Sequence, residues 1–126
     1  MQSMDMEKYY KYRKEIGELF LHDTDNIGNL ACKVLEIRDK NKCVNSINLS
    51  IQEGEISVEL DNSTTNKKKT DIVNKITNCI GRYIVDNKSK LDKETAESEE
   101  FNDAILNNNN FCDIYSIGDE VVFRLF

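Results

Sequence analysis

His22 and four cysteines are the residues of this chain best suited to covalent catalysis or to binding a metal ion. An imidazole that deprotonates a thiol creates a nucleophile, and thiolates together with imidazoles bind zinc. The cysteines, at positions 32, 43, 79 and 112, form no Cys-x-x-Cys pair, and the nearest is ten residues from the only histidine. Zinc ligands usually come in closely spaced pairs, so we expect no metal site. One enzyme alternative stays open, a pair of His22 with Cys32, Cys43 or Cys79 assembled by the fold.

Other motifs of catalysis or cofactor binding are missing from the sequence. The five glycines are scattered, so the Gly-rich loops that bind phosphates or dinucleotides are absent. Residues 23–28 partly resemble a calcium-binding loop, but the later ligands that such a loop requires are misplaced. Paired carboxylates such as Glu55 and Glu59 are more simply solvated strand residues than a general acid and base. We therefore predict a protein with no catalytic residues and no cofactor.

The charge balance indicates which partners the chain can bind. It has 17 basic and 23 acidic residues, a net charge of -6, which disfavours direct binding to nucleic acid. The run Lys67, Lys68, Lys69 is the local exception, and its position between a strand and a helix favours a solvated connection. A protein partner with basic character fits this acidic chain better.

Length and hydropathy indicate one domain, residues 1–126, in the cytoplasm. No run approaches the 18 apolar residues of a membrane span, and residues 1–14 lack the apolar stretch of a signal peptide. Without a secretion signal, a disulfide framework is not expected.

Two hairpins are predicted from alternating apolar residues on either side of a glycine-containing turn. The first covers Ile47 to Leu60 and turns at Glu53-Gly54; the second covers residues 111–126 and turns at Gly118-Asp119. Residues 30–38 are ambiguous. A helical stripe would contain Ile27, Leu30, Ala31, Val34 and Leu35. A strand there would instead complete a three-strand meander with the first hairpin, and we favour the strand.

Apolar residues at three-to-four spacing predict a helix from Met4 to Leu21 and a second one that is capped by Thr70 and ends at Asn87. A short helix through Leu106 could begin at Asp92, with Phe101, Ile105 and Leu106 docked on the core. The predicted fold is therefore α+β, an antiparallel sheet of two hairpins with about five strands, packed by an N-terminal helix and a central amphipathic helix.

Three surfaces could bind a partner. The first is the outer face of the first hairpin, with Glu55 and Glu59. The second is the acidic segment 92–103, in particular its carboxylates Glu97, Glu99 and Glu100. The third is a helix face on which Tyr9 and Tyr12 lie near Arg13, because exposed tyrosines beside arginine are typical anchors in interfaces; for this face we favour a position at the edge of the core over an exposed one. We expect a non-catalytic intracellular protein-binding module, an inhibitor or immunity-like protein that blocks a basic partner protein.

In size, charge and predicted element order the chain also loosely resembles small acidic chaperones of type III secretion, although it lacks their usual final helix. Those proteins are homodimers that bind an effector segment along their sheets. This resemblance implies the alternative function, a chaperone-like homodimer, and mass in solution would separate the two.

Overall fold

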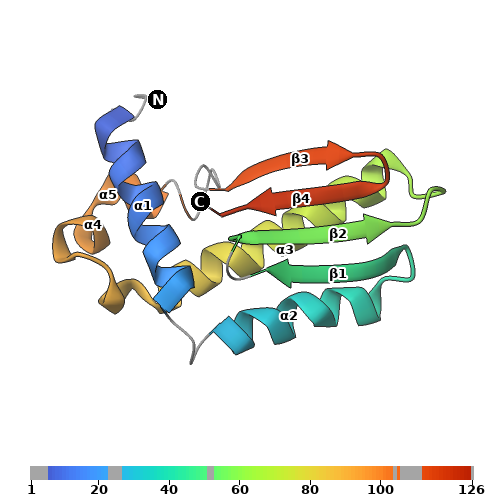
Figure 1. Cartoon of the computed structure of the whole chain (residues 1–126), viewed down its shortest axis with the longest axis horizontal. Helices are drawn as coiled ribbons and strands as arrows, with labels where there is room; N and C mark the ends of the chain where they lie inside the picture. The colour runs from blue at the N-terminus through green and yellow to red at the C-terminus, as the bar shows by residue number, and fades with distance from the viewer. Residues whose placement is uncertain (1–5, 23–26, 51–52, 104, 106–111, 126) are drawn as a thin grey trace.

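The computed structural model describes residues 6–22, 27–50, 53–103, 105 and 112–125, which form a mixed helix-and-strand fold (Figure 1). A four-stranded antiparallel sheet has the strand order β1-β2-β4-β3. Helix α3 crosses behind the sheet, α2 runs beside β1, and α1 lies with α4 and α5 at one end (Figure 1). We call the face of the sheet opposite α3 the outer face. In the described part of the chain, no helix lies over it (Figure 1).

Both predicted hairpins are confirmed. Strands β1 (Val44–Ser50) and β2 (Glu55–Leu60) form the first, and β3 (Asp113–Ile117) and β4 (Glu120–Arg124) form the second. Gly54 and Gly118 adopt positive φ angles of 65° and 59° at the two turns, a conformation that L side chains rarely adopt. The inner face carries six buried residues of β2, of β4 and of the position that follows β4: Ile56, Val58, Leu60, Val121, Phe123 and Leu125. Val122 of β4 is also buried, but it lies on the outer face.

The prediction of a strand at residues 30–38 is wrong. This segment belongs to helix α2 (Ile27–Lys40), so the sheet has four strands rather than about five, and there is no three-strand meander. The helical alternative was correct, because Leu30, Val34 and Ile37 are buried at three-to-four spacing. The resemblance to secretion chaperones used three strands after the first helix, and the structure has two at that point.

Helix α3 (Asn66–Asp86) begins earlier than predicted. Its N-cap is Thr65, whose hydroxyl oxygen accepts a hydrogen bond from the Lys68 backbone N–H, so Thr70 is not the cap. The run of three lysines therefore lies in the first turn of a helix rather than in a connection. The predicted end is confirmed, since Asn87 caps the C-terminus and its side chain donates to the Tyr83 carbonyl.

The remaining helices close one end of the core. Helix α1 (Met6–His22) lies beside α4 (Lys93–Glu97) and α5 (Glu99–Asp103). A short 3₁₀ helix, η1 (Lys88–Lys90), precedes α4 in the chain. The predicted docking of Phe101 and Ile105 is confirmed by their exposures of 0% and 4%, whereas Leu106 lies outside the described residues. Two short helices, α4 and α5, stand where a single one was predicted. Among the described residues, no helix has both the length and the apolar composition needed to cross a membrane.

Candidate protein-binding surfaces

The outer face of the sheet consists of three rows of side chains that run across the strands in the order β1, β2, β4, β3. The register gives these rows as Ser46–Glu59–Glu120–Ile117, Asn48–Ser57–Val122–Tyr115 and Ser50–Glu55–Arg124–Asp113. The predicted site residues Glu55 and Glu59 thus lie on this face, two positions apart on β2.

Charges are balanced in the row that contains Glu55. The Arg124 guanidinium donates to Glu55 Oε1 at 3.1 and 3.3 Å and lies 6.0 Å from the centre of the Tyr115 ring. Arg13 of α1 donates to both carboxylate oxygens of Asp113 at 3.0 and 3.1 Å. Both carboxylates in this row are therefore already paired with an arginine of the same chain, so Glu55 offers less to a partner than its exposed neighbour Glu59.

The Arg13–Asp113 pair predicts a pH dependence of stability. Hydrogen bonds from Arg13 hold the pKa of the Asp113 carboxyl below its usual range. The stabilisation is fully present above the unfolded pKa, about 3.9, and is lost as the pH falls through the lower folded value. We expect wild type to be more stable than Asp113→Asn by up to about 1 kcal/mol near neutral pH, because the pair is partly exposed. Urea unfolding at a series of pH values should show this difference vanish in acid, and a constant difference would contradict the assignment.

The row that contains Glu59 is not balanced. Glu59 on β2 lies directly opposite Glu120 on β4, and Asp119 in the neighbouring turn is exposed. In the described part of the chain, no lysine or arginine forms an ion pair with Glu59 or Glu120. Like charges directly opposite each other destabilise a sheet by a few tenths of a kcal/mol or more. We call Glu59 and Glu120 the acidic pair; sequence reasoning missed Glu120 because the pairing of β2 with β4 is not local.

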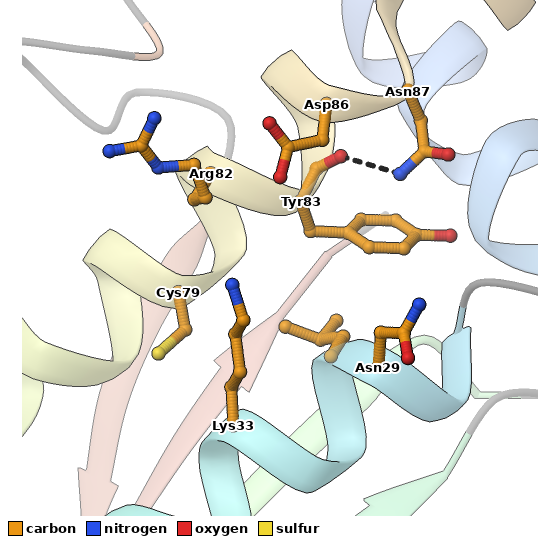
Figure 2. Close-up of a pocket in the computed structure, with 8 residues that line it drawn as sticks. Asn29, Lys33, Cys79, Arg82, Tyr83, Asp86 and Asn87 are labelled. Carbon is orange, nitrogen blue, oxygen red and sulfur yellow. Dashed lines mark hydrogen bonds between the residues drawn. The ribbon is translucent and has the colours of Figure 1, made fainter.

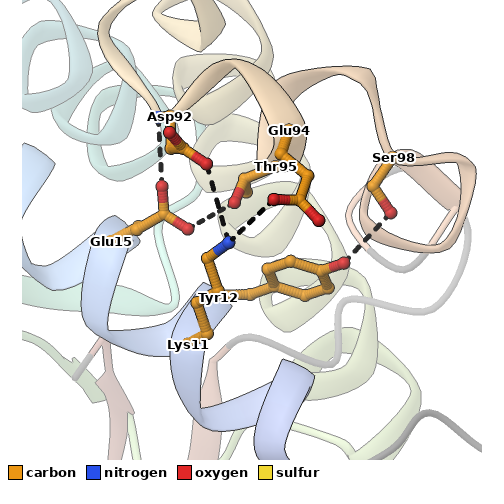
Figure 3. Close-up of polar contacts among 7 residues, drawn as sticks. All are labelled: Lys11, Tyr12, Glu15, Asp92, Glu94, Thr95 and Ser98. Atoms are coloured by element: carbon orange, nitrogen blue, oxygen red, sulfur yellow. Dashed lines mark hydrogen bonds and ion pairs between the residues drawn. The ribbon is translucent and has the colours of Figure 1, made fainter.

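The acidic segment 92–103 is partly neutralised by α1 (Figure 3). Lys11 Nζ lies 3.6 Å from an Asp92 oxygen and 3.7 Å from a Glu94 oxygen, and Lys8 forms the same kind of pair with Glu100 at 3.7 Å. Glu15 accepts hydrogen bonds from the Asp92 backbone N–H at 3.0 Å and from the Thr95 hydroxyl. These contacts attach α4 to α1, so part of this segment's charge is used inside the fold.

The predicted carboxylates of this segment have different surroundings. Glu97 at the end of α4 and Glu99 at the start of α5 are exposed, and neither forms an ion pair with a described residue. Glu100, in contrast, is paired with Lys8.

The favoured position of Tyr12, at the edge of the core, is confirmed, and the hypothesis of an exposed tyrosine face is wrong for this residue. Its side chain is 5% exposed, its hydroxyl is 3.1 Å from Ser98 Oγ, and its ring contacts Phe101 edge to face (Figure 3). Tyr12 faces inward because α4 and α5 cover that side of α1. Tyr9 also belongs to α1, but its side chain lies outside the described residues.

A polar pocket of about 180 Å³ lies between α2 and α3 (Figure 2). Lys33 extends from α2 toward α3, which contributes Cys79, Arg82 and Asp86 to the lining. Burial raises the pKa of the Cys79 thiol, so the thiol is protonated at neutral pH and is a poor nucleophile. The pocket therefore contains opposite charges without an activated nucleophile.

The other residues with catalytic potential are not brought together by the described structure. All four cysteines are free thiols, and burial raises the pKa of Cys112 to about 12. His22 ends α1, and its side chain lies outside the described residues, so a Cys/His pair stays a hypothesis. Within the described ranges, no group of three or more His, Cys, Asp or Glu side chains is placed to hold a metal ion.

Comparison of the chain with models of protein families, with curated proteins and with solved structures finds no match.

Proposed function

We propose that this protein is a non-catalytic protein-binding module of the cytoplasm, an inhibitor or immunity-like protein that blocks a basic partner through the outer face of its sheet. The observation that carries the proposal is the acidic pair: Glu59 and Glu120 lie opposite each other on an open face, with no ion-pair partner among the described residues. A lysine or arginine of the partner placed between these carboxylates would replace a repulsion by two attractions.

The distribution of charge argues against α2 and α3 as the surface that binds a basic partner. Helix α3, behind the sheet, and helix α2, beside β1, together contain eight basic and four acidic residues. Since the whole chain has a net charge of -6, the rest of the chain has a net charge of -10. Such a separation of charge orients a basic partner toward the acidic side during the encounter.

The acidic segment is the second candidate surface. Glu97 and Glu99 are exposed, but Asp92, Glu94 and Glu100 are already paired with lysines of α1. The fold therefore already uses part of this segment's charge, whereas neither carboxylate of the acidic pair has an ion-pair partner among the described residues, and we favour the sheet face.

Affinity capture from the native host, followed by kinetics with the captured protein, tests the proposal. Glu59→Gln with Glu120→Gln removes two charges from the sheet face, and Glu97→Gln with Glu99→Gln removes two charges from the acidic segment as a matched control. We expect a basic partner whose association with the sheet-face variant is slower by roughly three- to tenfold at low salt. The control should associate like wild type. Equal rates for wild type and the sheet-face variant would contradict the proposal.

A further inference from the structure

Strand β3 concentrates the exposed apolar side chains of the described structure. Four large hydrophobic side chains are markedly exposed, and three of them belong to β3: Ile114 at 42%, Tyr115 at 37% and Ile117 at 63%. The fourth is Tyr10 of α1, at 64%. All five residues of β3 are exposed, although the strand is part of the sheet.

The two edge strands of the sheet, β1 and β3, differ in how well they are protected from pairing with a further strand. At the β1 edge, α2 packs along the strand, and the register shifts between Val44 and Ser46. Bulges and covering helices are devices that prevent another strand from pairing with an edge. In the described part of the chain, no helix or strand lies along the free side of β3 (Figure 1), and β3 contains neither lysine nor proline nor a shift in register.

The hairpin geometry shows which backbone groups β3 offers. Ile117 and Glu120 flank the two-residue turn, and in such hairpins the flanking residues form a hydrogen-bonded pair. Because bonded and non-bonded pairs alternate, Tyr115 and Asp113 also bond to β4. Ile114 and Ser116 therefore direct their backbone N–H and C=O groups away from β4, toward the free side.

We propose that a second copy of this chain pairs with β3, antiparallel and edge to edge, about a two-fold axis at Tyr115. In this register Ile114 forms a hydrogen-bonded pair with Ser116 of the other copy, which uses the free groups of both strands. Tyr115 then lies opposite Tyr115 of the other copy. The two form a non-hydrogen-bonded pair, in which side chains are closest.

Two features favour a second copy of the chain as the partner of the β3 edge: no like charges meet at the interface, and the assembly ends at two copies. The only charged residue of β3, Asp113, is paired with Arg13 of its own chain and would lie opposite the apolar Ile117 of the other copy, so no like charges meet. The interface is self-complementary, and because the β1 edge is covered, strand addition stops at two copies. The product is one continuous sheet of eight strands, since each chain contributes four.

The two-fold axis is perpendicular to the sheet, so the outer faces of both copies lie on the same side. The dimer does not depend on the proposed function, because the acidic pair is not part of the β3 edge. If both hold, one assembly presents two acidic pairs on one surface.

Mass in solution, measured by light scattering and by sedimentation equilibrium, tests the proposal. We expect twice the 14.6 kDa of one chain for wild type. Tyr115→Glu should be monomeric, because two carboxylates would face each other at the axis, whereas within one chain the new carboxylate lies beside Arg124. Tyr10→Glu, an equally drastic change at an exposed aromatic residue of α1, is the matched control and should stay dimeric. A monomeric wild type, or a dimeric Tyr115→Glu, would overturn the proposal.

Two further variants test the register and the strand pairing. Tyr115→Lys should also be monomeric alone, but an equimolar mixture of the Lys and Glu variants should restore the dimer, because opposite charges then meet at the axis. Ser116→Pro removes a backbone N–H on the free side while keeping the bonds to β4, and should abolish the dimer. Thermal unfolding confirms that each variant is folded. A mixture that stays monomeric, or a folded Ser116→Pro that stays dimeric, would overturn the pairing.

Discussion

Replacing Phe101 by Ala should lower the free energy of unfolding by about 3–5 kcal/mol, the range for truncating a buried phenylalanine. The Phe101 side chain is fully buried, and its ring centre lies 5.2 Å from that of Tyr12 in an edge-to-face arrangement at 70°. Helix α5 is only five residues long and cannot be stable alone. Phe101 therefore holds α5 against α1, and removal of its side chain leaves a cavity between these two helices.

Urea unfolding, followed by circular dichroism, measures this effect. Glu99→Ala is the control on the same helix, since its side chain is exposed and the change should stay within about 0.5 kcal/mol. Tyr12→Phe keeps the aromatic contact and removes only the hydrogen bond with Ser98, at a cost of about 1 kcal/mol. A loss of less than about 1 kcal/mol for Phe101→Ala would contradict the packing described here.

The hairpins could be predicted from the sequence because their signals are local. Alternation of apolar and polar residues in β2, after Gly54, fixes which of its side chains face the core, and a one-residue slip would expose them all. Around Gly118 the alternation is less regular, since Val121, Val122 and Phe123 are consecutive and all buried. Positions 56, 58 and 60 of β2 are buried as the alternation predicts. The outer position of Glu55 and Glu59 follows from the same pattern.

Helix α2 could not be assigned from the sequence with the same certainty, because its short apolar runs fit two periods. Val34, Leu35 and Ile37 suggest a strand entering a turn, and β-branched residues favour strands locally. Packing against α3 and β1 decides for the helix, since it buries Leu30, Val34 and Ile37 together. Such contacts between distant segments do not show in a local pattern.

The candidate site depends on strand order in the same way. Glu120 lies 61 positions after Glu59 in the chain, and only the antiparallel pairing of β2 with β4 puts the two carboxylates opposite each other. The full burial of Tyr12 could not be derived from the sequence for a related reason. The sequence of α1 does not show that α4 and α5 cover this side chain. A residue outside the main apolar stripe of a helix is typically exposed when that helix is considered alone.

Replacing Ile80 by Ala should lower the free energy of unfolding by about 2–5 kcal/mol. Ile80 lies on the buried stripe of α3 with Ile72 and Ile76, is 3% exposed and belongs to the main core cluster. Because α3 contacts the helix α2 and crosses behind the sheet (Figure 1), a cavity at this position cannot be filled by one mobile surface side chain.

Asn78→Ala is the matched control for Ile80→Ala, because it lies on the same helix with an exposed side chain and should change stability by no more than about 0.5 kcal/mol. Urea titrations of both variants should give slopes like that of wild type, so that the shift in midpoint reports stability alone. The loss of stability should be large at position 80 and small at position 78. This difference follows from the three-to-four spacing of the buried apolar residues of α3, which includes Ile80 and leaves out Asn78. Equal midpoints for the two variants would show that a different face of α3 packs against the sheet.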